Sequence, residues 1–171
     1  KCAAYCNQMT ANCGTVFASN AACMAACALY PDEPSRATGG NSVQCRTYHA
    51  GAPADGDAAT HCPHAMADGG GVCGTKCAAY CDRAMANCKG STAIYGSRSL
   101  CEASCAAFPA GTLADTAVNT LGCRFYHASV ARLNPSLHCP HASVDGGGVC
   151  GADKCAAYCN QMTANCGTVF A

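Results

Sequence analysis

The chain has 171 residues, no formal net charge, 12% charged residues and 19 cysteines. Cysteine is therefore about a ninth of the chain, above the roughly 8–10% that marks a disulfide scaffold, and large apolar side chains are too scarce for a conventional core. Neutral charge argues against nucleic acid as a partner, and no apolar run reaches the roughly 20 residues of a membrane span. We expect an extracellular or cell-surface protein in which disulfides replace hydrophobic burial.

The chain begins with two predicted helices. Residues 1–13, KCAAYCNQMTANC, contain good helix formers and neither glycine nor proline, which predicts about three helical turns. Residues 20–31 predict a second helix that Pro31 ends, with Asn20 as its cap. Each helix carries the spacing C-x3-C, which places two cysteines one turn apart on one face. This pattern favours a helical hairpin joined by disulfides.

Two further segments complete the predicted unit. CRTYHAGA, residues 45–52, predicts a short third helix, as does CRFYHASVARL later in the chain. DGGGVCG, residues 68–74, predicts a tight connector, because consecutive glycines leave little room for side chains and adopt unusual backbone angles.

The whole pattern then repeats. Residues 1–75 align with residues 76–153 through KCAAYC, CR-x-YHA, HCPHA and DGGGVCG, and residues 154–171 are identical to the first eighteen. The sequence thus predicts two repeat units and the start of a third, as in a segment of a longer array. Each full unit has eight cysteines, and we expect Cys155 and Cys159 of the third to have partners beyond the given sequence.

The cysteine spacing predicts part of the disulfide pattern. Two ladder bridges join the hairpin helices of each unit, and one further bridge links the third helix to the HCPHA segment. The predicted pairs are Cys2–Cys27, Cys6–Cys23, Cys45–Cys62, Cys77–Cys105, Cys81–Cys101 and Cys123–Cys139. The pairing of Cys13, Cys73, Cys88 and Cys150 stays open, since eight cysteines allow 105 connectivities. The expected fold class is all-α, small and disulfide-rich, with tandem cysteine-laced hairpins stacked linearly.

Histidine is the residue type whose pattern points to chemistry. All six histidines fall in two matching sets, each made of one Y-H and one H-C-P-H. Three imidazoles can bind Cu or Zn, while the alternative is that they pack and hydrogen-bond near a disulfide. The candidate metal ligands are His49, His61 and His64, then His127, His138 and His141.

Other cofactors and activities find no support in the sequence. The C-x-x-C-H motif of c-type haem is absent, and C-x3-C suits a disulfide hairpin better than a zinc–thiolate cluster. We expect no enzyme, because the cysteines are committed and no activated nucleophile stands out.

Glycans are a further candidate partner. The sequence has no permitted N-x-S/T sequon, because Pro135 blocks Asn134 to Ser136. O-linked sugar on hydroxyls of the variable loops would increase solubility, and the candidate positions are Thr15, Ser19, Thr38, Thr112 and Thr116.

The combination of CR-x-YH, HC-x-HA and GGGVCG resembles Cys-rich tandem-repeat segments in surface proteins of environmental bacteria. The resemblance covers both units and implies no activity. Together with the repeat, it favours a structural segment of an extracellular, disulfide-stabilised filament whose partner is itself. Two alternatives stay open: a fibre that holds Cu or Zn for storage or electron transfer, and a secreted binding module displayed in series.

Overall fold

The computed structural model describes residues 1–151, 155, 158–159, 162–163 and 166. Within these residues the regular elements are all helices, and the β-pairing is confined to an isolated bridge between Gly147 and Gly151. The expected all-helical, disulfide-rich class is confirmed, while linear stacking stays a prediction. The chain divides into two compact units, Lys1–Ala79 and Tyr80–Ala171. The predicted third repeat, 154–171, lies largely outside the described residues.

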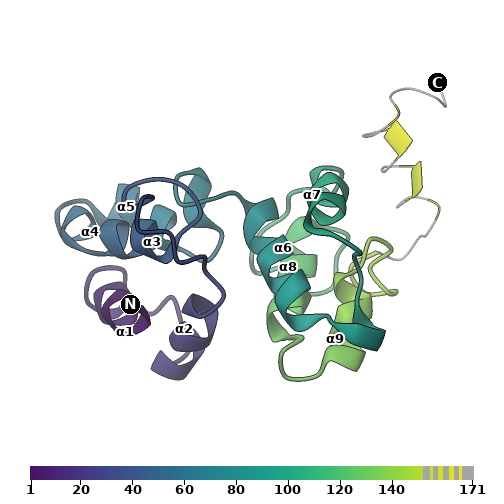
Figure 1. Ribbon diagram of the computed structural model, residues 1–171, viewed down its shortest axis with the longest axis horizontal. Coiled ribbons are helices and arrows are strands. Elements are labelled where there is room, and N and C mark those ends of the chain that lie inside the picture. Colours follow the sequence, from purple (N-terminus) through teal and green to yellow (C-terminus); the bar gives the residue numbers. More distant parts are fainter. Residues whose placement is uncertain (152–154, 156–157, 160–161, 164–165, 167–171) are drawn as a thin grey trace. The chain divides into compact units, whose positions relative to one another are not determined.

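Figure 1 shows the helices in chain order. The N-terminal unit contains α1 (Cys2–Asn12), α2 (Asn20–Cys27), α3 (Val43–Ala50), α4 (Ala52–Gly56), α5 (Ala58–Ala65) and the 3-10 turn η1 (Gly69–Gly71). The remaining helices are α6 (Lys76–Asn87), η2 (Gly90–Thr92), α7 (Arg98–Ala106), α8 (Leu121–Val130) and α9 (Pro135–Ala142). In the N-terminal unit α1 packs on α2, α3 and α5, and in the C-terminal unit α8 packs on α9. No helix of the described residues is long and apolar enough to cross a membrane.

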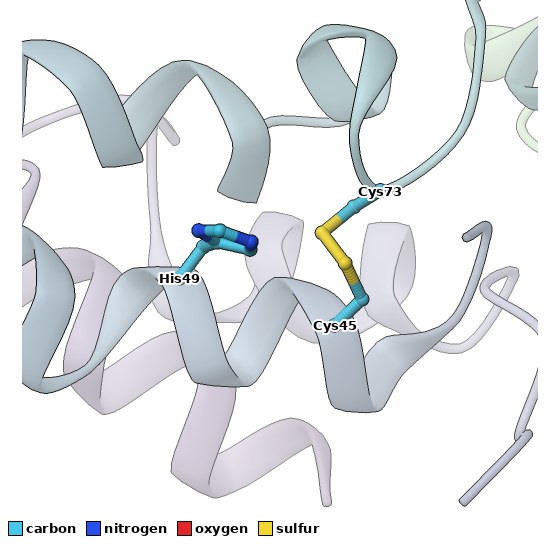
Figure 2. Close-up of side chains that lie close together, drawn as sticks. All are labelled: Cys45, His49 and Cys73. Atoms are coloured by element: carbon cyan, nitrogen blue, oxygen red, sulfur yellow. A yellow bond between two sulfur atoms is a disulfide. The ribbon is translucent and has the colours of Figure 1, made fainter. Parts of the chain in front are cut away.

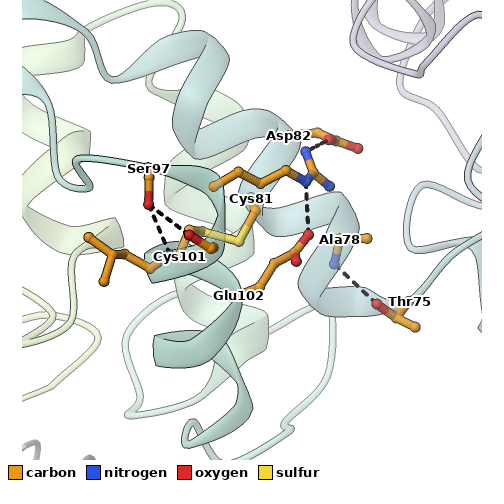
Figure 3. A network of polar contacts seen from close by, with 10 residues as sticks. Thr75, Ala78, Cys81, Asp82, Ser97, Cys101 and Glu102 are labelled. Atoms are coloured by element: carbon orange, nitrogen blue, oxygen red, sulfur yellow. Dashed lines mark hydrogen bonds and ion pairs between the residues drawn. A yellow bond between two sulfur atoms is a disulfide. The ribbon is translucent and has the colours of Figure 1, made fainter.

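Hydroxyl caps set where the second helix of each hairpin begins. The Ser19 hydroxyl, one residue before the predicted cap, accepts a hydrogen bond from the backbone N–H of Ala22. Ser97 caps α7 in the same way (Figure 3). Such caps satisfy a backbone donor that the first helical turn leaves without a partner. The helix α2 ends at Cys27, four residues before Pro31, so the proline does not terminate it.

The hairpin helices are joined by the expected ladder disulfides. The structure contains Cys2–Cys27 and Cys6–Cys23, with Cα–Cα distances of 5.6 and 5.9 Å. In the C-terminal unit it contains Cys81–Cys101 (Figure 3), where Arg98 also bridges the carboxylates of Asp82 and Glu102. Cys77 and Cys105 are each disulfide-bonded, and their predicted pairing with one another stays a prediction.

The predicted bridges Cys45–Cys62 and Cys123–Cys139 are wrong. The structure instead contains Cys13–Cys62, Cys45–Cys73, Cys88–Cys139 and Cys123–Cys150. The reason is the helical arrangement of HCPH. Residues three apart, such as the two histidines, lie on the same face of α5. Each residue of a helix is rotated by about 100° from the one before it, so the cysteine next to the first histidine points to a different side. Because the two histidines face α3, Cys62 faces the end of α1, where its sulfur lies 3.6 Å from the Asn12 carbonyl oxygen.

A buried arginine in each unit connects the third helix to the glycine-rich loop. Arg46 is fully buried and lies over the Tyr30 ring, with 4.1 Å between the guanidinium carbon and the ring centroid. Its Nε donates to the Met66 carbonyl at 3.1 Å and its Nη2 to the Ala67 carbonyl at 3.4 Å. Arg124 makes the matching contacts in the C-terminal unit. These arginines fix the segment that follows the HCPH histidines.

Candidate metal centre

The first candidate centre lies between α3 and α5. His49 is in the last turn of α3, whereas His61 and His64 are one turn apart on α5. The sequence analysis predicts no helix here, and the structure shows α5 with Pro63 in its interior. The helix forms because the Asp57 carboxylate caps it, accepting from the Thr60 backbone N–H. We call these three histidines the first triad.

The three imidazoles of the first triad converge. The Nδ1 atoms of His49 and His61 lie 3.0 Å apart, and the ring centroids of His49 and His64 are 4.9 Å apart. One ring nitrogen from each histidine lies within 4.8 Å of the others. Nitrogens that share a tetrahedral ion at 2.0–2.1 Å are separated by about 3.3 Å. The rings therefore lie close to the separation that an ion would require.

A backbone carbonyl fixes the protonation pattern of His49. Its Nε2 lies 3.3 Å from the Thr38 carbonyl oxygen, which can only accept, so Nε2 carries the proton. The lone pair of His49 is consequently on Nδ1, which accepts a hydrogen bond from Nδ1–H of His61. An ion bound through both Nδ1 atoms would replace that proton. Histidines that ligate metals usually donate their other ring N–H to a carbonyl or carboxylate in this way. The ring is thus held in the tautomer that a metal site needs.

A second observation comes from His64. Its Nδ1 atom is buried and has no hydrogen-bond partner among the described residues. A buried polar atom without a partner is costly in a stable protein. An ion coordinated through Nδ1 of His64 would give that nitrogen a partner.

The second triad, His127, His138 and His141, reproduces this geometry in the C-terminal unit. The Nδ1 atoms of His127 and His138 are 2.9 Å apart, and His127 Nε2 lies 3.1 Å from the Thr116 carbonyl oxygen. The Nδ1 atom of His141 is also buried without a partner among the described residues. Both triads therefore have the same arrangement, and we call His49 and His127 the central histidines.

Burial favours the neutral form of the central histidines. Desolvation lowers the pKa of His49 and of His127 below the ordinary value, as it does for His138. Each central histidine is only 6% exposed, whereas the outer two of each triad are half-buried. Neutral imidazole is the form that binds metal, and the half-buried rings leave a side through which an ion can enter.

A disulfide lies beside each central histidine. Figure 2 shows the His49 ring beside the Cys45–Cys73 bridge, and these three side chains lie within 4.8 Å of one another. Their sulfurs are bonded to each other and are not thiolate ligands. The bridge instead holds α3 against the chain that follows the glycine run, which keeps the central histidine in place.

The six predicted histidines form two clusters, and each unit contains one cluster of three. What sequence reasoning missed is the pair of carbonyls at Thr38 and Thr116. Each precedes its histidine by 11 residues, so identical spacing in both copies was an available signal. The signal is weak, because a backbone carbonyl acts in the same way whatever its side chain. All five candidate glycosylation positions are exposed, while glycosylation itself stays a prediction.

The fold and site define a small, disulfide-stapled helical protein with a repeated three-histidine cluster. Residues 74–154, a little under half of the chain, match the BfoA family C-terminal domain, and this region contains the second triad. A stretch of 68 residues is 35% identical to the Aurasperone B biosynthesis cluster protein A of Aspergillus niger, covering 39% of this chain and 22% of that protein. The chain thus spans about a fifth of that relative. No solved structure matches.

Proposed function

We propose that each unit binds one transition-metal ion, Cu or Zn, through its three histidines. The observation that carries this proposal is the same convergence of three imidazoles in both units, each with its central histidine held by a backbone carbonyl. Packing alone would explain buried rings. It does not explain why a buried Nδ1 in each triad lacks a hydrogen-bond partner among the described residues.

The donor set decides between classes of metal. Three neutral imidazoles suit Zn and Cu, whereas Ca and Mg prefer oxygen ligands. Three protein ligands leave a fourth position for water or another small ligand. The sulfurs near each centre are in disulfides, so the site lacks the thiolate donors of structural zinc fingers. The role that fits is the storage or transfer of a metal ion, or of an electron when the ion is copper.

Metal stoichiometry tests this proposal. Purified oxidised protein would be loaded separately with Zn²⁺ and Cu²⁺, passed over a desalting column and measured by elemental analysis. We expect two ions per chain. Replacing His49 and His61 by alanine removes the first triad and should reduce the content to one ion, because the second triad remains.

The two triads act as controls for each other. The matched variant His127→Ala with His138→Ala should also retain one ion, and the four-histidine variant should retain none. Tyr48→Phe, an exposed neighbour of the first triad, should retain two. Substoichiometric metal in the unchanged protein, or an equal loss in the Tyr48 variant, would contradict the proposal.

A second candidate role concerns the scaffold. We also propose that the units are non-enzymatic segments of an extracellular filament, with O-linked sugar on exposed loop hydroxyls. The supporting observation is that 16 cysteines in two repeated units are disulfide-bonded. Electron microscopy of the native assembly tests this role. A regular axial repeat would support it, and discrete monodisperse particles would refute it.

A further inference from the structure

The N-terminal unit contains a pocket whose wall includes none of the histidines of the first triad. The cavity of about 410 Å³ lies where α1, α3 and the start of α4 meet. Its wall is mostly apolar and includes Ala4, Val43, Thr47 and Pro53, with Gln8 as a polar member. Small-molecule sites in proteins commonly have volumes of 300–1,000 Å³ and this mixture of apolar walls with a few polar groups.

The C-terminal unit fills the equivalent place with its own side chains. By the alignment of the two copies, Arg83 stands where the first unit has Gln8, and Phe125 stands where it has Thr47. The guanidinium carbon of Arg83 lies 4.4 Å from the centroid of the Phe125 ring. Arg83 is 2% exposed and Phe125 is 7% exposed, so this surface is closed. In the first unit Gln8 and Thr47 are only half-buried.

The side chains that fill the second unit show which chemistry the place accommodates. They are an aromatic ring and, stacked on it, a planar group that carries N–H donors. Neither residue has an equivalent side chain in the first unit, although α1 and α3 there correspond to α6 and α8 of the second unit. A molecule that combines a flat ring with a donor would replace both.

Two side chains of the first unit fit such a molecule. Gln8 lines the pocket, and its amide oxygen is buried without a hydrogen-bond partner among the described residues. Because that oxygen is covered, the half-buried Gln8 side chain must rotate to turn it toward the pocket, where a donor on a bound molecule would give it a partner. Tyr48, also in the wall, is 47% exposed and offers an aromatic surface for stacking.

We propose that this pocket binds a planar aromatic molecule that carries an N–H or O–H donor. The site belongs to the first unit alone, because Arg83 and Phe125 occupy its counterpart. It is separate from the metal proposal, since none of the triad histidines lines the pocket. The two copies of the repeat thus differ at this place: the first has an open pocket, and the second has its own side chains there.

Indole and 1-methylindole are the probes that test the proposal, since they differ in the N–H donor. The full isotope-labelled chain would be titrated with each, followed by NMR chemical shifts. We expect saturable indole binding with a dissociation constant in the low millimolar range, as befits so small a ligand. The largest shifts should fall on Gln8 and Thr47, with little change at Arg83 or Phe125. Binding of 1-methylindole should be weaker by about 2- to 10-fold.

Side chains of the second unit supply the variants. Gln8→Arg combined with Thr47→Phe should fill the pocket and abolish saturable indole binding. Asn7→Asp introduces the neighbouring residue of the second unit outside this pocket and should leave binding unchanged. The milder Thr47→Phe alone guards against a folding defect in the double variant and should weaken binding. No saturation in the unchanged chain, equal binding of the two indoles, or full binding by the double variant would overturn the proposal.

Discussion

Replacing Arg46 by methionine is expected to lower the free energy of unfolding of the N-terminal unit by about 3–5 kcal/mol. The methionine keeps much of the apolar volume and removes the guanidinium. Arg46 is fully buried and donates to four oxygens, those of Asn41, Ser42, Met66 and Ala67. Removing it takes one donor from each of these acceptors, although the carbonyls of Ser42 and Met66 keep a backbone N–H donor.

The magnitude follows from the contacts of the guanidinium. A hydrogen bond to a charged group contributes about 1.5–3 kcal/mol, and the stacking on Tyr30 adds about 0.5–2 kcal/mol. These contributions together exceed the predicted loss of about 3–5 kcal/mol. The difference arises because burying the charge of Arg46 costs several kcal/mol, which offsets part of what its contacts contribute. A lysine at this position should also be destabilising, since a single ammonium cannot serve carbonyls in two different segments.

Urea unfolding followed by tyrosine fluorescence and circular dichroism measures the effect, with intact disulfides verified by mass. Arg132, an exposed arginine, supplies the matched control, and Arg132→Met should change stability by less than about 0.5 kcal/mol. Because Arg46 also holds the chain after the first triad, its loss should weaken metal binding there. A loss below about 1 kcal/mol for Arg46→Met would refute the reasoning that this donor network stabilises the unit.

Three further outcomes are expected. Metal-free protein should lose stability as the pH falls below about 6.5, because the unfolded chain binds protons that His49, His127 and His138, with their lowered pKa, do not; urea unfolding across pH should show a shallower slope when both central histidines are glutamine. Replacing Cys13 and Cys62 together by serine opens a loop with a separation of 49 residues and should cost about 4 kcal/mol; an intact-stability result would contradict the pairing. Gly70→Ala places a Cβ 2.7 Å from the Pro63 carbonyl oxygen and should be about 1–3 kcal/mol more destabilising than Gly71→Ala, whose Cβ meets open space and whose φ is also positive.

Local patterns in the sequence were enough for the hairpins. Cysteines four residues apart on a helix share a face whatever surrounds them, so C-x3-C opposite C-x3-C already defines the ladder Cys2–Cys27 and Cys6–Cys23. The same is true of the repeated histidines, whose matching positions in two copies are enough to indicate both triads. These features depend on spacing along one element.

Features that depend on several distant segments could not be predicted in this way. Proline is unfavourable inside a helix, so the HCPH segment does not indicate α5 by itself, and the direction of Cys62 depends on that helix. The wrong pairing of Cys45 with Cys62 followed directly. The same limitation applies to the pocket near Gln8, whose openness depends on which side chains three helices present to one another.

Residue spacing alone predicts the repeat, the helical class, the cysteine ladder and the histidines that form the candidate site. Three features depend on how the helices pack: which cysteines close the long loops, which carbonyl fixes the tautomer of His49, and how Arg46 joins three segments. The two groups differ in the range of the interactions behind them. Helix periodicity depends on residues that are close together in the sequence. A carbonyl or a disulfide partner that packing brings close comes from a distant segment, and the spacing of neighbouring residues does not predict it.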